Sequence, residues 1–173
     1  MKNNRITRIV TLLLAFVLTL TLVPAAFAES FRPSENCIDL ITPFEPCHLE
    51  AYKDPAGVWV IGYQHTANVV PGMKLANEAQ ARELLREDIV KYGTQVQNAI
   101  NSGAISFEMN QNRFDALTAF TFNCGSGNLL KLVKGHTADV VADKFLLFTN
   151  GGGKRLPILV QRRQAEKALF LAN

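Results

Sequence analysis

The chain has 173 residues, of which 48% are hydrophobic and 19% charged, and its formal net charge at neutral pH is +3. The excess charge comes from Lys2, Arg5 and Arg8, which precede an apolar run; without residues 1–28, 15 basic residues face 15 acidic ones. The remaining chain is therefore near neutral, which excludes a basic nucleic-acid-binding protein. Residues 29–173 have the usual length of one domain and can enclose a hydrophobic core.

The N-terminal segment has the pattern of a secretory signal. The basic residues precede the run IVTLLLAFVLTLTLVPAAFA at residues 9–28, in which the small residues Ala26 and Ala28 flank Phe27. We expect cleavage before Glu29 and a secreted or periplasmic protein. The run is about twenty residues long, enough for a membrane span, so an uncleaved anchor is the alternative. In both cases membrane contact is expected only through this segment.

Three cysteines, Cys37, Cys47 and Cys124, lie beyond the signal segment. An odd number permits one internal disulfide and leaves one thiol free, and the pairing stays open. The three cysteines and three histidines lack close metal-ligand spacing, so no metal is expected. We expect no organic cofactor either.

The first predicted helix begins after Ser34, a suitable N-cap. Pro43 and Pro46 would bend or end it, because proline lacks the amide that a helix interior needs. Glu45 would then stand at the C-terminal end of this helix. The apolar face has the spacing i, i+3, i+4 and i+7 of an amphipathic helix, and it consists of Cys37, Leu40, Ile41 and Phe44.

A β-hairpin is predicted over residues 49–62, with Asp54 in its turn. A long helix follows over residues 78–100, capped by Asn77. Ser106 would cap a second helix over residues 107–123, which is too apolar for a surface helix and is predicted to be central to the core. The glycines of CGSGN at residues 124–128 end it.

The C-terminal third continues the helical pattern. Thr137 would cap a helix over residues 138–148, and NGGG at residues 150–153 is predicted to be a loop. Pro157 suits the first position of a final helix that reaches about Leu171. The whole pattern predicts a mostly helical α+β domain with one small hairpin near its N-terminus.

Glu45 and Asp54 are candidates for a catalytic pair. Cleavage of a glycosidic bond needs one protonated carboxylic acid and one carboxylate from different elements. Glu45 follows Phe44, and an apolar surround favours the protonated form, whereas a turn would keep Asp54 ionised. A glutamate at a helix end and an aspartate in a turn are also common structural features, so spacing alone leaves both interpretations open.

The stretch ITPFEPCHLEAYKDPAGVWVIGYQHT at residues 41–66 resembles the signature of the phage-type lysozymes, glycoside hydrolase family 24. That signature has a Glu, eight residues, an Asp, five residues and a Thr; Glu45 and Asp54 match it with the spacing intact. The resemblance continues through PGMKLANEAQARELLREDI, QNRFDALTAFTFNCGSGN and GGGKRLPILVQRRQAEKALFL. It covers nearly the whole chain after the signal segment.

This resemblance implies a lysozyme-like domain of two lobes flanking a cleft. It also implies hydrolysis of the β-1,4 bond between N-acetylmuramic acid and N-acetylglucosamine in bacterial peptidoglycan. Glu45 would be the general acid, and Asp54 would position or activate water. We also expect Tyr63, Asn123 and Gly125 to bind substrate, with the Asn123 side chain and the backbone at Gly125 bonding to acetamido groups; the alternative for Gly125 is a signal that only ends the helix. A monomer is expected.

Val60 occupies the place of the family's threonine, which helps to hold the attacking water. Valine has nearly the shape of threonine but lacks its hydroxyl, and loss of one positioned donor can slow a reaction by about 10² to 10³. Pro46, Gln64 and Ile158 also replace residues that are usually glycine in the family. These departures support an alternative: a catalytically impaired peptidoglycan-binding or scaffold protein with the same fold.

Three further side chains have competing interpretations. We expect His65 to pair with a carboxylate and fix the hairpin; the alternative, a peptidase in which His65 acts with Cys47, has no third residue to orient the histidine. Arg162 and Arg163 would place a guanidinium near Glu45, or would be the solvated face of the last helix.

Overall fold

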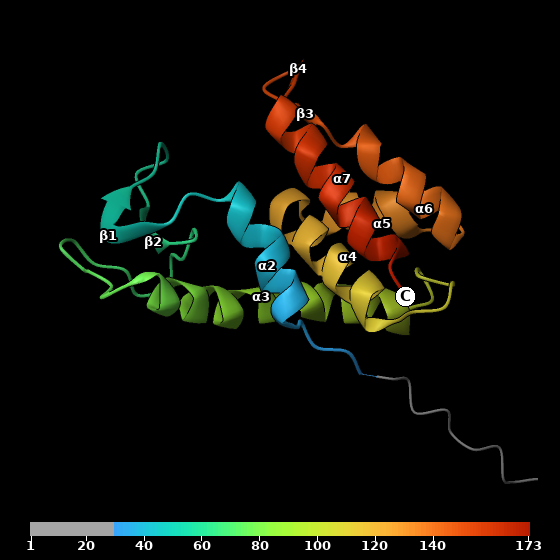
Figure 1. Ribbon diagram of the computed structural model, residues 1–173, viewed down its shortest axis with the longest axis horizontal. Coiled ribbons are helices and arrows are strands. Elements are labelled where there is room, and N and C mark those ends of the chain that lie inside the picture. Colours follow the sequence, from blue (N-terminus) through green and yellow to red (C-terminus); the bar gives the residue numbers. More distant parts are fainter. Residues whose placement is uncertain (1–29) are drawn as a thin grey trace, which may run out of the picture.

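The structure, a computed structural model, describes residues 30–173. The predicted signal segment, residues 1–28 with cleavage before Glu29, lies outside this range. Two small antiparallel sheets accompany the helices of the described part, which confirms the mostly helical α+β fold (Figure 1). The principal helices are α2 (Glu35–Ile41), α3 (Glu78–Asn101), α4 (Gln111–Cys124), α5 (Ser126–Val133), α6 (Ala138–Lys144) and α7 (Pro157–Leu171).

The predicted hairpin is formed by strands β1 (His48–Lys53) and β2 (Trp59–Gly62). It lies at the N-terminal end of α3, whereas the other long helices gather around the C-terminal part of that helix (Figure 1). The hairpin and the helical body thus form two parts joined along α3.

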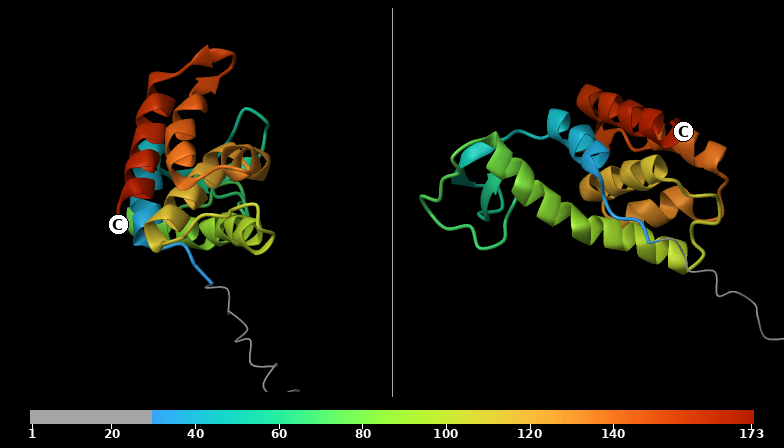
Figure 2. Two further views of the ribbon diagram at one scale, coloured as in Figure 1. Left: turned by 90° about the vertical axis from the view of Figure 1, so that its right-hand side faces the viewer. Right: turned by 60° about the horizontal axis from the view of Figure 1, so that its bottom comes forward.

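Helix α4 is central to the core, as predicted. It lies between α3 and α7 (Figure 2), and eight consecutive residues from Phe114 to Thr121 are buried. One apolar cluster joins α4 to α5, α6, α7 and the C-terminal half of α3. A second joins α2 to the N-terminal half of α3 and to Tyr63. The chain therefore buries apolar surface on both sides of α4.

Two predicted helix starts are confirmed by their capping bonds. The Ser34 side chain accepts from the backbone N–H of Asn36, and the Asn77 side chain accepts from that of Gln80. Pro157 stands at the start of α7, where its missing N–H costs nothing. Local sequence determines these three boundaries.

Two local predictions were wrong. Helix α4 begins after Asn110 rather than Ser106, because Asn110 Oδ1 accepts from the N–H of Arg113 at 2.8 Å. Residues 150–153 form a hairpin rather than an unpaired loop, with strands β3 (Asn150–Gly151) and β4 (Lys154–Arg155). Gly152 and Gly153, at φ 57° and 77°, adopt the left-handed geometry that a tight hairpin turn requires.

The short helices complete the fold. A 3₁₀ turn, η1 (Thr42–Phe44), follows α2, and a second, η2 (Phe145–Leu147), follows α6. Helix α5 was not predicted; Gly125, at φ 78°, ends α4, and α5 starts at the next residue. All three cysteines are free thiols. Within residues 30–173, no helix is both long and apolar enough to cross a membrane.

Candidate active site

Glu45 directly follows the 3₁₀ turn η1, where its backbone becomes extended at φ −118° and ψ 132°. Its side chain is 14% exposed, and Arg162 of α7 donates from Nη1 to Glu45 Oε1 at 2.6 Å. The Arg162 guanidinium also lies 5.9 Å from the centre of the Phe44 ring. The setting of Glu45 is therefore partly apolar, as expected, but its immediate partner is a buried cation.

The partner arginine belongs to a buried cluster on α7. Arg162, Arg163 and Glu166 are all at most 3% exposed. Both arginine side chains contact the Glu166 carboxylate. Burial raises the pKa of Glu166 to about 7, although the guanidinium groups oppose the shift. The predicted guanidinium near Glu45 is therefore that of Arg162, and neither arginine belongs to a solvated face of α7.

Asp54 lies in the turn of the β1–β2 hairpin and is half-buried. Its Oδ1 accepts from the backbone N–H groups of Ala56 at 2.9 Å and Val58 at 2.8 Å. Its own N–H donates to the Val58 carbonyl at 2.9 Å. The carboxylate is therefore held by the backbone of the next four residues, a local arrangement that aspartate in turns commonly adopts.

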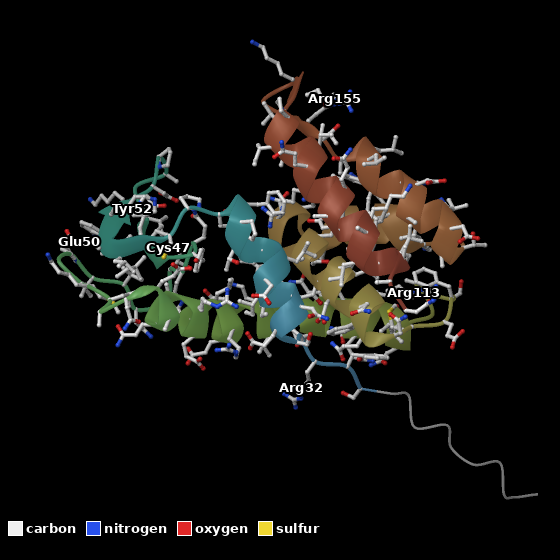
Figure 3. All side chains as sticks on the ribbon, in the orientation of Figure 1. Arg32, Cys47, Glu50, Tyr52, Arg113 and Arg155 are labelled. Atoms are coloured by element: carbon white, nitrogen blue, oxygen red, sulfur yellow. The ribbon has the colours of Figure 1, made fainter. Side chains whose placement is uncertain are left out.

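Val60 is 1% exposed and lies in strand β2, where its Cα partner across the hairpin is Tyr52. Tyr52 marks this hairpin in Figure 3, together with Cys47 at its start. The position that the sequence resemblance aligns with the family's threonine is therefore buried, and its valine supplies no hydroxyl.

The three predicted substrate-binding residues lie in two places. Asn123 Oδ1 accepts from Arg163 Nη2 at 2.8 Å. Gly125 leaves open space where a Cβ would be. Tyr63 is buried elsewhere, and its hydroxyl donates to Glu78 Oε1 at 2.7 Å. A hollow of about 300 Å³ is lined by Asn123, Cys124, Asn128, Phe148, Asn150 and Leu159.

His65 has the structural role that was predicted. Its Nδ1 lies 2.9 Å from Asp88 Oδ2, and its Nε2 lies 2.9 Å from the Ala67 carbonyl oxygen. The main chain of His65 also exchanges two hydrogen bonds with Ile61. Nδ1 therefore ties the hairpin to α3 and Nε2 is engaged by the adjacent main chain, which leaves neither ring nitrogen available as a base for Cys47.

Sequence reasoning missed Glu166. It stands four residues after Arg162 and three after Arg163, the spacings at which side chains meet on a helix. This spacing was the available signal, since a carboxylate so placed can pair with both arginines.

A small antiparallel hairpin part beside a mostly helical body matches the α+β fold of lysozyme-like muramidases. The model of the family described as phage lysozyme matches residues 42–166. The chain belongs to this phage lysozyme family. It is thus a lysozyme-type glycoside hydrolase, and the endolysin family implies peptidoglycan as the substrate.

Individual relatives agree with this assignment. An endolysin of Acyrthosiphon pisum secondary endosymbiont phage 1 is 37% identical over 146 residues, covering 79% of this chain and 96% of the relative. The endolysin of Salmonella phage P22 is 35% identical over 149 residues, covering 80% and 97%. Among solved structures, the muramidase domain of SpmX from Asticaccaulis excentricus superposes with a TM-score of 0.71 at 30% identity, covering 83% of this chain and 99% of that domain.

Proposed function

We propose that the protein hydrolyses the β-1,4 bond between N-acetylmuramic acid and N-acetylglucosamine, with Glu45 as the general acid and Asp54 as the carboxylate that positions or activates water. The observation that carries the proposal is the contrast in how the two groups are held. Glu45, with a side chain that is 14% exposed, pairs with the buried Arg162 of α7, whereas Asp54 accepts hydrogen bonds from the backbone of its own hairpin turn. Glycoside hydrolysis requires two carboxyl groups on different elements, and the family match over residues 42–166 includes Glu45 after η1 and Asp54 in the hairpin turn.

The reaction would use these groups in turn. Glu45 in its protonated form donates to the leaving glycosidic oxygen, and Asp54 in its ionised form orients a water toward the sugar carbon. Asn123 lines the hollow of about 300 Å³ and Gly125 follows its lining residue Cys124 in the chain; both would bind acetamido groups of the substrate. Tyr63 would shape the hairpin side of the binding surface.

Val60 favours a second candidate function, a catalytically impaired protein that binds peptidoglycan. Its buried side chain keeps the packing of the hairpin, but no hydroxyl is available to hold the attacking water. If the protein is a lysozyme that Val60 weakens, Val60→Thr should leave the rate of hydrolysis unchanged or raise it.

A reducing-end assay on purified peptidoglycan tests the main proposal. Glu45→Gln should lower the release of reducing ends by about 10² to 10⁴, whereas the control Glu87→Gln changes an exposed glutamate of α3 and should leave it unchanged. Equal release by wild type and Glu45→Gln would refute the assignment of the acid. If wild type sediments with peptidoglycan and releases no reducing ends, the second candidate is correct.

We also propose that residues 1–28 direct export and are removed, and that the released protein is a monomer. The basic start and the apolar run support export. Mass spectrometry of protein recovered outside the cytoplasm should give a chain beginning at Glu29, and an intact N-terminus would favour the retained anchor. Size-exclusion chromatography with light scattering measures the oligomeric state.

A further inference from the structure

The buried cluster on α7 connects the proposed acid to a second part of the site. Arg162 reaches Glu45, and Arg163 reaches two residues at the C-terminal end of α4. Arg163 Nη2 donates to Asn123 Oδ1 at 2.8 Å, and its Nη1 lies 2.7 Å from Cys124 Sγ. The two neighbouring arginines therefore contact two different parts of the proposed site: Arg162 contacts the acid, and Arg163 contacts the C-terminal end of α4.

Glu166 is the carboxylate that both arginines share. Its Oε1 accepts from Arg163 Nη2 at 2.9 Å, and its Oε2 lies 2.9 Å from Arg163 Nε. The same Oε1 lies 3.4 Å from Arg162 Nε, a charge contact without a hydrogen bond. Glu166 is 0% exposed, so these contacts are shielded from water.

Arg162 has few other contacts that could fix it. Among residues 30–173, its Nη2 is buried and makes no hydrogen bond. The ring centres of Phe44 and Phe122 lie 5.9 Å from the guanidinium carbon. Contact with a ring does not fix the orientation of a guanidinium as a hydrogen bond does. Arg162 is therefore oriented by a hydrogen bond to Glu45 on one side and by the charge of Glu166 on the other.

Charge balance leads to the same conclusion. Glu45 and Glu166 together offset the charges of Arg162 and Arg163, so the cluster is neutral when both carboxylates are ionised. The thiols of Cys37 on α2 and Cys124 on α4 also face Glu166, but burial raises the pKa of each and keeps it uncharged near neutral pH. Without the Glu166 charge, two buried guanidinium groups would compete for one carboxylate.

We propose that Glu166 is a positioning residue of the lysozyme site, which holds the Arg162 guanidinium against Glu45 and the Arg163 guanidinium against Asn123. This inference rests on the proposed function in that it takes Glu45 as the acid. Glu166 itself touches neither substrate nor water. Its effect on the reaction passes through the two arginines.

The two contacts have separable consequences for the kinetics. Loss of the hold on Arg162 displaces the partner of the acid and lowers kcat, since misplacement by about 1 Å can cost about 10²-fold. Loss of the hold on Arg163 frees the Asn123 amide and raises KM.

The experiment compares Glu166→Gln with wild type and with Glu87→Gln, which makes the same chemical change at an exposed site of α3. The first readout is independent of activity: ¹⁵N relaxation of the arginine Nε–H groups. Arg162 and Arg163 should be as rigid as the backbone in wild type and in Glu87→Gln, and mobile in Glu166→Gln. Unchanged rigidity in Glu166→Gln would overturn the proposal.

The second readout is the release of reducing ends as a function of substrate concentration. Glu166→Gln should lower kcat by about tenfold or more and raise KM, and the control should do neither. Wild-type kcat and KM in Glu166→Gln would contradict the positioning role. If wild type releases no reducing ends, the proposed function fails, while the relaxation experiment still decides whether Glu166 holds the arginines.

A charge-balanced variant covers the case in which the single substitution prevents folding. The double variant Glu166→Gln with Arg163→Gln restores neutrality around Glu45 but removes the hold on Arg162. If Glu166 positions Arg162, the double variant stays folded and remains slow, with a mobile Arg162 Nε–H. Wild-type kcat in the double variant would show that Glu166 serves only to balance charge.

Discussion

The two proposed catalytic carboxylates are held in opposite ways. Glu45 depends on Arg162, which lies 117 positions further along the chain. Asp54 depends on the backbone N–H groups of Ala56 and Val58, two and four residues away. The first arrangement exists only when α7 has packed against the helical body, whereas the second forms within one hairpin turn. The helical side of the site is therefore coupled to global folding, and the hairpin side is mainly local.

Replacement of Arg162 should give the largest change in stability. Arg162→Leu removes the buried cation that pairs with Glu45, whose side chain is 14% exposed, and breaking a buried ion pair costs up to about 3 to 5 kcal/mol. Urea unfolding at pH 7 measures this loss. The matched control is Arg86→Leu. Arg86 also pairs with carboxylates, Glu35 and Glu83, but its side chain is 40% exposed. If the two substitutions cost the same, the ion pair at Glu45 does not couple the site to folding.

Two substitutions at Asp54 separate its chemistry from its turn. Asp54→Asn keeps a side-chain oxygen for the N–H groups of Ala56 and Val58, so stability should be preserved while activity falls by about 10² or more. Asp54→Ala also removes that oxygen, so it should lose the activity and, in addition, about 1 kcal/mol of unfolding free energy. Thermal unfolding and the reducing-end assay measure the two effects. A loss of stability in Asp54→Asn equal to that in Asp54→Ala would show that the charge itself holds the turn.

The helical side should also respond to pH through Glu166. Its folded pKa of about 7 lies above the ordinary value of 4.5, so between these values the folded protein keeps a proton that the unfolded chain releases. Stability from this group is therefore present below about pH 4.5 and is lost as pH rises to about 7. Glu166→Gln should flatten that part of the stability profile relative to wild type. Parallel profiles for wild type and variant would mean that Glu166 does not titrate in this range.

The difference between local and long-range contacts also determines what could be predicted from the sequence. The cap at Ser34, the cap at Asn77 and the turn at Asp54 depend on side chains that bond to the nearest backbone, so short patterns were sufficient. The start of α4 was misplaced because both Ser106 and Asn110 can cap a helix, and the choice depends on how the preceding loop packs.

The contacts of α7, in contrast, join residues that are far apart in the sequence. Two arginines were recognised near the end of the sequence, but only the fold shows that Arg162 turns toward Glu45 and Arg163 toward Asn123. Glu166 was overlooked because a glutamate on a terminal helix is usually exposed, and its burial depends on the packing of α4 against α7. The site could therefore be predicted where it is local and not where distant helices meet.

The smallest expected effect concerns strain on the hairpin side. Gln64 has φ 70°, a left-handed conformation that a residue with a Cβ adopts at a cost of about 1 to 2 kcal/mol. The exposed side chain has one long contact, 3.5 Å from Nε2 to the Tyr52 hydroxyl, so little is lost on removing it. Gln64→Gly should raise the unfolding free energy by about 0.5 to 1 kcal/mol, because relief of strain exceeds the added entropy of the unfolded chain. Gln64→Ala keeps the Cβ and serves as the control: if it stabilises the protein as much as glycine does, the side chain rather than the backbone conformation is the source of the strain.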